Sequence, residues 1–286
     1  MIIEQIKLQE GISDTSLTAY LQEPPLSSMD WMERPAVIIC PGGAYLGYSE
    51  KETEPVAIKF LSEGYQAFVL KYSIGDTAYF PAPFLDAAKA VMMVREHAKQ
   101  WGIHPDRISL CGFSTGAHVA ATLGAMWQKA ELAKALNADN NCFKPNALLL
   151  GYPVLDLYRF GESNREHSQE MKTLIDMMFS CIFGSADPDK SDMMKWDVAS
   201  NITSVYPPTF LWITTEDSFV DVEQSMDFIK RLAAYKVPYE FHVFEKGSHG
   251  SSIGSSTAGF SEEAIKKLGN SPQWVALAMR WLDGNR

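Results

Sequence analysis

The sequence predicts an α/β protein with a mostly parallel central sheet of about eight strands and helices on both faces. Apolar runs such as 36–40 and 209–214 contain no alternating polar residues, which is typical of strands buried on both faces. Segments with helical spacing, such as 54–62 and 222–235, separate these runs. A Gly-x-Ser-x-Gly turn at 112–116 joins one such run to a helical segment. Together these observations predict a sheet with crossover helices.

Each element is expected from its own pattern. The segment 15–21 alternates polar and apolar residues, which suits an antiparallel edge strand. The further strands are expected at 36–40, 66–72, 108–111, 147–150, 209–214 and 239–244. The helices are expected at 54–62, about 84–101, 117–126, 222–235 and about 272–282.

One long stretch breaks this alternation of strands and helices. Between Pro153 and Pro207 no strand is evident, and methionines and other apolar residues recur at helical spacing. We expect a helical, cap-like insertion at about 156–200 within a single domain, 1–286. Its helices either pack on the sheet as ordinary core or roof the active site and line an acyl pocket, with Met178 and Phe179 as pocket candidates.

Composition excludes several classes of protein. A hydrophobic content of 46% supports a large core, and a net charge of −10 argues against nucleic acid or an anionic membrane as partner. The N-terminus does not resemble a signal peptide, and no apolar run is long enough to span a membrane. Four widely separated cysteines suit a reducing compartment. We therefore expect a cytoplasmic protein without metal or cofactor, of undetermined oligomeric state.

The turn at 112–116 has the form of a nucleophile elbow. The segment 107–112 predicts a strand and 117–126 a helix, so Ser114 lies on the tight turn between them. The flanking glycines leave room for the close turn that lifts the serine hydroxyl above the edge of the sheet. An inert serine in a glycine-rich turn is the alternative.

A serine nucleophile needs a base and a carboxylate. His249 lies in a Gly/Ser-rich loop just after the last predicted strand, where its imidazole can reach Ser114. Asp217 follows the preceding strand and is the favoured acid, with Glu216 beside it and Asp156 as the competing candidate. His118 is one turn into the elbow helix, where packing or a hydrogen bond is the expected role.

Backbone donors for an oxyanion are expected at two places. The turn 41–45 (Pro-Gly-Gly-Ala-Tyr) follows an early strand, and its small residues let N–H groups approach a bound carbonyl oxygen. The Thr115 amide, at the start of the elbow helix, is the natural second donor. A plain glycine turn is the alternative interpretation of 41–45.

These motifs resemble the α/β-hydrolase superfamily over nearly the whole chain from about Thr15. The turn 41–45, the stretch 101–108 (Trp-Gly-Ile-His-Pro-Asp-Arg-Ile) and the elbow 112–118 are similar to the esterase/lipase branch, and most of all to carbohydrate acetyl esterases, including acetylxylan-esterase-like proteins. The resemblance implies an α/β-hydrolase fold. The residues that it implies are a triad of Ser114, Asp217 and His249 and an oxyanion hole from the N–H groups of Gly43, Ala44 and Thr115.

Two residues depart from the pattern of that branch. Ala44 stands where the family has a third glycine, which is tolerable if its φ is negative and its amide still points inward. Thr115 replaces the commoner alanine, and together with Tyr45 it is expected to crowd the reacting centre and favour short acyl groups.

The expected function is therefore that of a serine carboxylesterase. It would hydrolyse short-chain esters, including O-acetyl groups on carbohydrates, through an acyl-enzyme intermediate. The alternatives are a serine aminopeptidase or amidase of the same fold and a catalytically silent binding protein.

Overall fold

The computed structural model describes residues 1–8, 15–23 and 33–284. Their strands form one eight-stranded sheet in the order β1-β2-β4-β3-β5-β6-β7-β8. From β4 to β8 all neighbouring strands are parallel, whereas β2 is antiparallel to both β1 and β4. The predicted fold class is thus confirmed.

The elements have the following bounds. The strands are β1 (Ile2–Lys7), β2 (Ser16–Leu21), β3 (Arg34–Cys40), β4 (Gln66–Lys71), β5 (Ile103–Phe113), β6 (Ala147–Gly151), β7 (Thr209–Thr214) and β8 (Tyr239–Phe244). The α-helices are α1 (Glu54–Ser62), α2 (Ala82–Glu96), α3 (Ala98–Trp101), α4 (Thr115–Met126), α5 (Ala130–Leu136), α6 (Leu157–Arg165), α7 (Gln169–Phe183), α8 (Lys190–Met194), α9 (Val222–Ala234), α10 (Glu262–Lys267) and α11 (Trp274–Gly284).

The strand predicted at 15–21 is antiparallel, as expected, but it is not the edge of the sheet. The outer strand is β1, which pairs with β2 along its whole length. Five of the six residues of β1 are exposed, so its sequence lacks the buried apolar face that marks a strand. Because β1 covers the outer edge of β2, five of the six β2 residues are buried.

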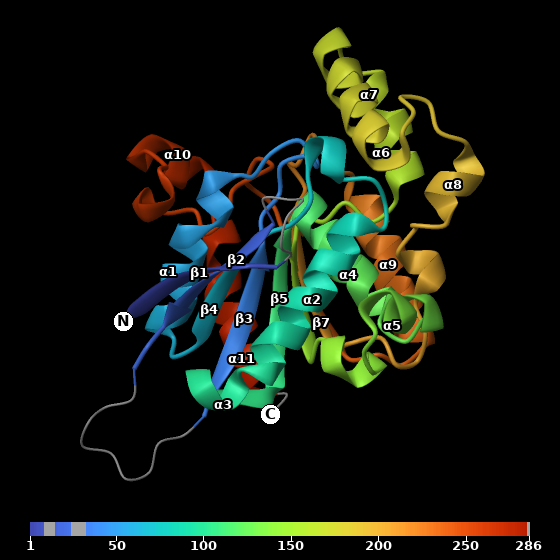
Figure 1. Ribbon diagram of the computed structural model, residues 1–286. Coiled ribbons are helices and arrows are strands. Elements are labelled where there is room, and N and C mark those ends of the chain that lie inside the picture. Colours follow the sequence, from blue (N-terminus) through green and yellow to red (C-terminus); the bar gives the residue numbers. More distant parts are fainter. Residues whose placement is uncertain (9–14, 24–32, 285–286) are drawn as a thin grey trace.

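Helices cover both faces of the sheet (Figure 1). The helices α2 and α4 pack together over one face, and α1 and α11 lie over the other. The central strands β6 and β7 are entirely buried between these two layers, and β3 and β5 are buried along their C-terminal parts. This burial explains the unbroken apolar runs of the sequence.

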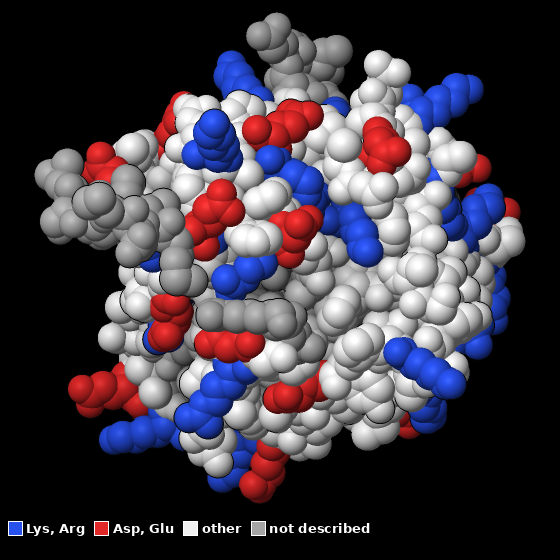
Figure 2. Space-filling view, turned by 90° about the horizontal axis from the view of Figure 1, so that it is seen from below, with Lys and Arg blue, Asp and Glu red and all other residues white. Residues whose placement is uncertain are grey.

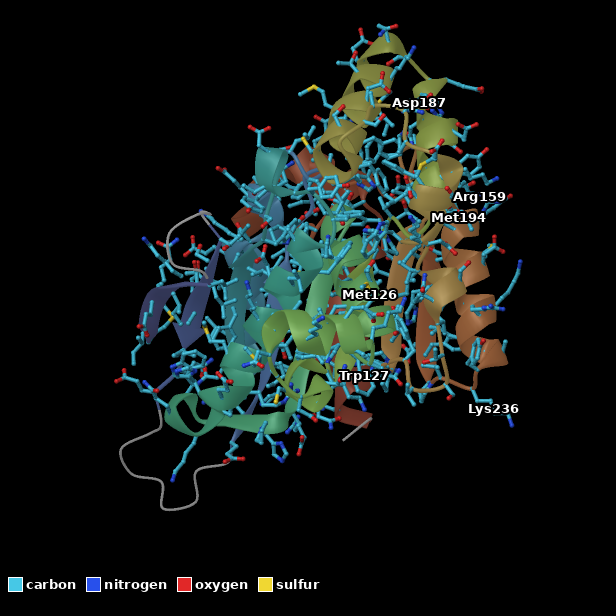
Figure 3. All side chains as sticks on the ribbon, turned by 45° about the vertical axis from the view of Figure 1, so that its right-hand side comes forward. Met126, Trp127, Arg159, Asp187, Met194 and Lys236 are labelled. Carbon is cyan, nitrogen blue, oxygen red and sulfur yellow. The ribbon has the colours of Figure 1, made fainter. Side chains whose placement is uncertain are left out.

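The regular elements of the segment 156–200 are all helices, and the segment projects beyond the end of β6 (Figures 1 and 3). The helices α6 and α7 pack closely. A Cβ atom added at Gly161 on α6 would lie only 2.8 Å from the ring of Phe179 on α7. The N–H group of Phe80 donates a hydrogen bond to the carbonyl oxygen of Ile182, which joins α7 to the connection before α2. In Figure 3, Arg159, Asp187 and Met194 of this segment lie above Met126 and Trp127 at the end of α4.

Charged side chains of both signs are mixed on the surface. Figure 2 shows one face of the molecule, on which basic and acidic side chains are interspersed and are not gathered by sign. Among the described residues no helix is long and apolar enough to cross a membrane.

Candidate active site

Ser114 is the single residue between β5 and α4, and its φ of 52° is in the left-handed region. The two flanking residues must be glycine, because neither position has room for a Cβ atom. A Cβ atom at Gly116 would lie 2.1 Å from the carbonyl oxygen of Cys40, and one at Gly112 would lie 2.5 Å from the Cα of Ala117. The N–H group of Ser114 donates to the carbonyl oxygen of Gly151 at 3.1 Å, which ties the turn to the end of β6. The local structure is therefore a sharp strand-to-helix turn with the serine at its apex.

The structure brings Ser114, His249 and Asp217 together. The Oγ atom of Ser114 lies 2.9 Å from Nε2 of His249, whose Nδ1 lies 2.8 Å from Oδ2 of Asp217. The other oxygen of Asp217, Oδ1, accepts hydrogen bonds of 2.9 Å from the N–H groups of Phe219 and Val220. The carboxylate is thus fixed by backbone donors on one side and faces the imidazole on the other.

The imidazole of His249 is held between two aromatic rings. The rings of Tyr152 and Phe219 each have their centroid 4.9 Å from that of His249. The His249 side chain is 21% exposed and that of Asp217 only 1%. The imidazole is therefore reachable from solvent, whereas the carboxylate of Asp217 is screened from water.

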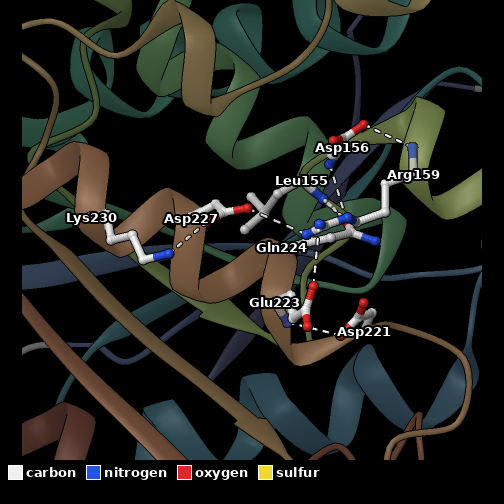
Figure 4. Close-up of polar contacts among 8 residues, drawn as sticks. All are labelled: Leu155, Asp156, Arg159, Asp221, Glu223, Gln224, Asp227 and Lys230. Carbon is white, nitrogen blue, oxygen red and sulfur yellow. Dashed lines mark hydrogen bonds and ion pairs between the residues drawn. The ribbon is translucent and has the colours of Figure 1, made fainter.

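The two other acids considered from the sequence have different partners. Asp156 accepts a hydrogen bond from the N–H group of Arg159 and caps α6, among the polar contacts between α6 and α9 drawn in Figure 4. Glu216 accepts a hydrogen bond of 3.1 Å from the N–H group of Gly247. Of the three acids, only Asp217 has a hydrogen bond with His249 in the structure.

The turn after β3 has an unusual backbone. Gly43, Ala44 and Tyr45 have φ values of 141°, 55° and 59°. The condition of a negative φ at Ala44 is therefore not met, and the alanine is held in a positive-φ conformation like the residues on either side of it. Within the described part of the chain, the N–H groups of Gly43 and Ala44 donate no hydrogen bond. Thr115 begins α4, and the first N–H groups of a helix lack partners within it.

Four side chains expected near the substrate are instead buried. Tyr45, Met178, Phe179 and Thr115 are all 0% exposed, so none presents a surface to a ligand in this structure. The pocket assignment of Tyr45, Met178 and Phe179 is therefore corrected: these side chains pack in the core and between helices. The crowding expected from Thr115 and Tyr45 is not seen either.

His118 is also a buried packing residue. Its Nε2 atom faces the carbonyl oxygen of Trp196 at 3.2 Å and must carry the proton. Its Nδ1 atom therefore accepts the hydroxyl proton of Tyr45 at 2.7 Å. Burial lowers the pKa of His118 from 6.5 to about 4, so the ring is neutral.

Two residues at this site were not found from the sequence. Tyr152 follows β6 at the same edge as Ser114, a position that could have identified it. Glu52 lies in a charged run that looks like an exposed surface (Ser49-Glu-Lys-Glu52), yet it is 1% exposed. Neither pattern nor spacing distinguishes Glu52 from the exposed Glu50 and Lys51. Among the described residues no cluster of histidine, cysteine and acidic side chains could hold a metal ion.

Comparison with known proteins identifies the family. The BD-FAE family model matches residues 26–232, which is most of the chain. The chain belongs to the BD-FAE family. The predicted resemblance to esterases of the α/β-hydrolase fold is thereby confirmed.

Curated relatives of this BD-FAE member include two proteins connected with xylan. Endo-1,4-beta-xylanase B of Butyrivibrio fibrisolvens is 29% identical over 83% of the chain and 35% of its own length. Acetylxylan esterase of Xylanibacter ruminicola is 24% identical over 82% of the chain and 44% of its own length. The chain thus spans about a third to a half of the length of these relatives.

Solved structures agree along almost the full length. An acetyl ester-xyloside bifunctional hydrolase from Caldicellulosiruptor lactoaceticus has a TM-score of 0.75 and 29% identity, covering 98% of this chain and 96% of its own. A carboxylesterase of Lactobacillus plantarum has a TM-score of 0.83 at 24% identity, covering 99% and 98% of the two chains. The second likeness concerns the fold alone.

Proposed function

We propose that this protein is a serine carboxylesterase that hydrolyses short-chain acyl esters, with O-acetyl groups on carbohydrates as the preferred substrate class. The observation that carries the proposal is the continuous chain of contacts from Ser114 through His249 to Asp217, beside a turn whose Gly43 and Ala44 N–H groups have no acceptor among the described residues. This is the arrangement that acyl transfer requires. The family and the esterases among its relatives support the same reaction class.

The chemistry follows from the hydrogen bonds. Nε2 of His249 takes the proton of Ser114 as Oγ attacks the ester carbonyl, and the resulting imidazolium returns it to the departing alcohol. Asp217 faces Nδ1 and keeps the proton there, which leaves Nε2 free to act as the base. Water then attacks the acyl-enzyme with the same histidine as base, and carboxylic acid and free Ser114 are produced.

The negative oxygen formed in each step needs donors that are already oriented. The N–H groups of Gly43, Ala44 and Thr115 are proposed for this role, because the first two have no other hydrogen-bond partner within the described residues. Thr115 adds the positive end of the α4 dipole. Losing one such donor typically costs about 10²–10³ in rate.

The proposed acyl preference no longer rests on crowding by Thr115 and Tyr45, since both side chains are buried. It rests on the relatives named for acetyl esters. A series of p-nitrophenyl esters from acetyl to octanoyl tests it. Activity that rises with chain length, with acetyl the poorest substrate, would contradict the short-chain preference and leave the serine mechanism intact.

The first test of the mechanism is Ser114→Ala. We expect a folded protein whose kcat falls by about 10⁴ or more, since the nucleophile is removed. The matched control is Ser225→Ala, which removes another buried hydroxyl, on α9, and is expected to keep wild-type kcat. Undiminished esterase activity in Ser114→Ala would refute the assignment.

Two further measurements separate the alternatives. Faster turnover of aminoacyl amides than of acetyl esters would favour an amidase. Failure of an organophosphonate to label wild-type Ser114 covalently would favour a silent binding protein. We expect labelling of the wild type and none of Ser114→Ala.

A further inference from the structure

A buried glutamate that the proposed mechanism does not use lies beside the site. Glu52 is in the short 3₁₀ helix Glu50–Glu52, and its side chain is 1% exposed. Burying a carboxylate is costly unless hydrogen bonds compensate for the lost water. Burial indeed raises the pKa of Glu52, while hydrogen bonds from its neighbours oppose that rise. Because burial of the Glu52 carboxylate costs free energy, we looked for what its hydrogen bonds do in the site.

The two oxygens of Glu52 bind two different parts of the site. Oε2 accepts a hydrogen bond of 2.7 Å from the N–H group of Gly42, the residue before the proposed oxyanion donors. Oε1 accepts a hydrogen bond of 2.6 Å from the hydroxyl of Tyr152. Since both partners are donors, the ionised carboxylate is the form that satisfies both of them.

The contacts of Tyr152 continue to the loop that carries His249. Its hydroxyl oxygen accepts a hydrogen bond of 3.0 Å from the N–H group of Ser252, and its ring packs on the imidazole of His249. The hydroxyl of Ser252 in turn donates to the carbonyl oxygen of Lys51 at 2.6 Å. The segment 51–52 is therefore joined to the histidine loop twice.

The Glu52 carboxylate also lies close to the backbone of the turn that carries the proposed oxyanion donors. A Cβ atom at Gly42 would lie 3.0 Å from Oε2 of Glu52 and 2.9 Å from Cβ of Ser114. Gly42 is thus packed between the glutamate and the proposed nucleophile. A shift of the Glu52 carboxylate would move the backbone from which the Gly43 and Ala44 donors extend.

We propose that Glu52 is a positioning residue whose carboxylate holds the oxyanion turn and the His249 loop in register with Ser114. This inference rests on the proposed function, because it assigns a role relative to that reaction. Glu52 touches none of the reacting atoms and acts through Gly42 and Tyr152. Small displacements of reacting groups lower the chemical rate strongly, and binding of the ester much less.

The test is Glu52→Gln, which keeps the size of the side chain and removes one of its acceptors. The amide NH₂ then faces either the Gly42 N–H, which cannot accept a hydrogen bond, or the Tyr152 hydroxyl, whose own proton would lose its acceptor if its oxygen received the amide N–H. We expect kcat for an acetyl ester to fall about tenfold to a hundredfold with KM changed by less than about threefold. The rate of covalent labelling by an organophosphonate should fall with kcat.

A matched control separates positioning from general loss of stability. Asp86 on α2 is a second buried carboxylate, 2% exposed, and it accepts hydrogen bonds from the N–H and hydroxyl groups of Ser73. Asp86→Asn should lower the unfolding midpoint and keep kcat near that of the wild type. If Asp86→Asn loses as much kcat as Glu52→Gln, the positioning role is refuted.

Tyr152→Phe keeps the test decisive if Glu52→Gln does not fold. It removes only the hydroxyl that links Glu52 to Ser252 and should lower kcat without a matching change in KM. The double variant should lose less than the product of the two single losses, because both act through one network. Wild-type kcat in folded Glu52→Gln, or in Tyr152→Phe where the former is unfolded, would overturn the inference. Activity of Ser114→Ala would instead overturn the proposed function itself.

Discussion

At the scale of single residues, backbone strain is concentrated around the proposed reacting centre. Ser114, Ala44, Tyr45 and Tyr152 all have positive φ values, although none of them is glycine. Such conformations cost about 1–2 kcal/mol for a residue with a Cβ atom. The surrounding packing must therefore hold them, and each of these side chains except Ala44 is nearly or fully buried. Because Ala44 is only partly buried, its substitution reports on backbone strain with little change in side-chain packing.

We predict that Ala44→Gly stabilises the protein. Relief of the left-handed strain gains about 1–2 kcal/mol, and the greater freedom of glycine in the unfolded chain costs about 0.4–1 kcal/mol. The net gain should be between about 0 and about 1.6 kcal/mol, measured by urea unfolding. Ala233→Gly, at an exposed position in α9, is the control and should lose up to about 1 kcal/mol. Equal destabilisation by both changes would contradict the strain at Ala44.

At the scale of elements, the close approach of α4 to β3 fixes the position of Ser114, the proposed nucleophile. Gly116, in the first turn of α4, touches the backbone at the end of β3. A Cβ atom there would lie 2.1 Å from the carbonyl oxygen of Cys40 and 2.4 Å from that of Pro41. Backbone atoms cannot rotate away as a side chain can, so any larger residue must displace either the helix or the turn that follows β3.

Gly116→Ala is therefore expected to destabilise the protein by about 3 kcal/mol, the upper part of the usual cost of overpacking. The esterase rate should fall as well, since the displaced turn carries the proposed oxyanion donors. Gly124→Ala on the same helix is the control. The atoms nearest to its Cβ atom would belong to the side chains of Leu148 and Tyr206, so a smaller cost is expected. Unfolding and kcat measured on both variants decide the matter, and equal costs would refute the argument.

The same scale shows what sequence reasoning can and cannot reach. The helix at 54–62 and the strands at 209–214 and 239–244 were predicted with the bounds that the structure has, because their apolar patterns end sharply. The outer strand β1 was missed because its residues are mostly exposed and its stability comes from pairing with β2.

Sequence reasoning anticipated which side chains lie together where spacing encodes geometry, and missed others where packing decides; the catalytic roles stay predictions. Ser114, Asp217 and His249 each follow a strand, so topology alone places them at one edge of the sheet. Glu52 is buried by neighbours that are distant in sequence, such as Tyr152, and no local pattern reveals this. The ring of Phe179 packs against Gly161, and no local pattern in the sequence reveals this contact.

At the scale of the whole molecule, one buried histidine links three parts of the fold. His118 on α4 accepts a hydrogen bond from Tyr45 in the turn after β3 and donates one to the carbonyl oxygen of Trp196 in the insertion. The ring of Phe80, just before α2, and that of Phe84, in the first turn of α2, pack against the imidazole of His118. No acidic side chain is among the partners that the structure gives the imidazole, so a charged ring would be poorly compensated there.

This burial makes the stability of the whole chain depend on pH. The pKa of His118 is lowered from 6.5 to about 4, so between these values the unfolded chain binds a proton that the folded chain does not. The free energy of unfolding must therefore decrease as the pH falls through this window. From about pH 7 to about pH 5 the contribution of His118 amounts to a loss of about 2 kcal/mol.

The buried carboxylates of Glu52 and Asp86 act in the opposite direction, because burial raises their pKa values and the folded chain then binds the extra proton. The histidine contribution is therefore isolated by comparing the wild type with His118→Gln, which does not titrate. In urea unfolding, the decrease between the two pH values should be smaller in the variant by about 2 kcal/mol, even though the variant is less stable at neutral pH. Parallel pH profiles of the two proteins would show that the folded structure accommodates a charged His118, and that the link between the turn, α4 and the insertion does not depend on a neutral ring.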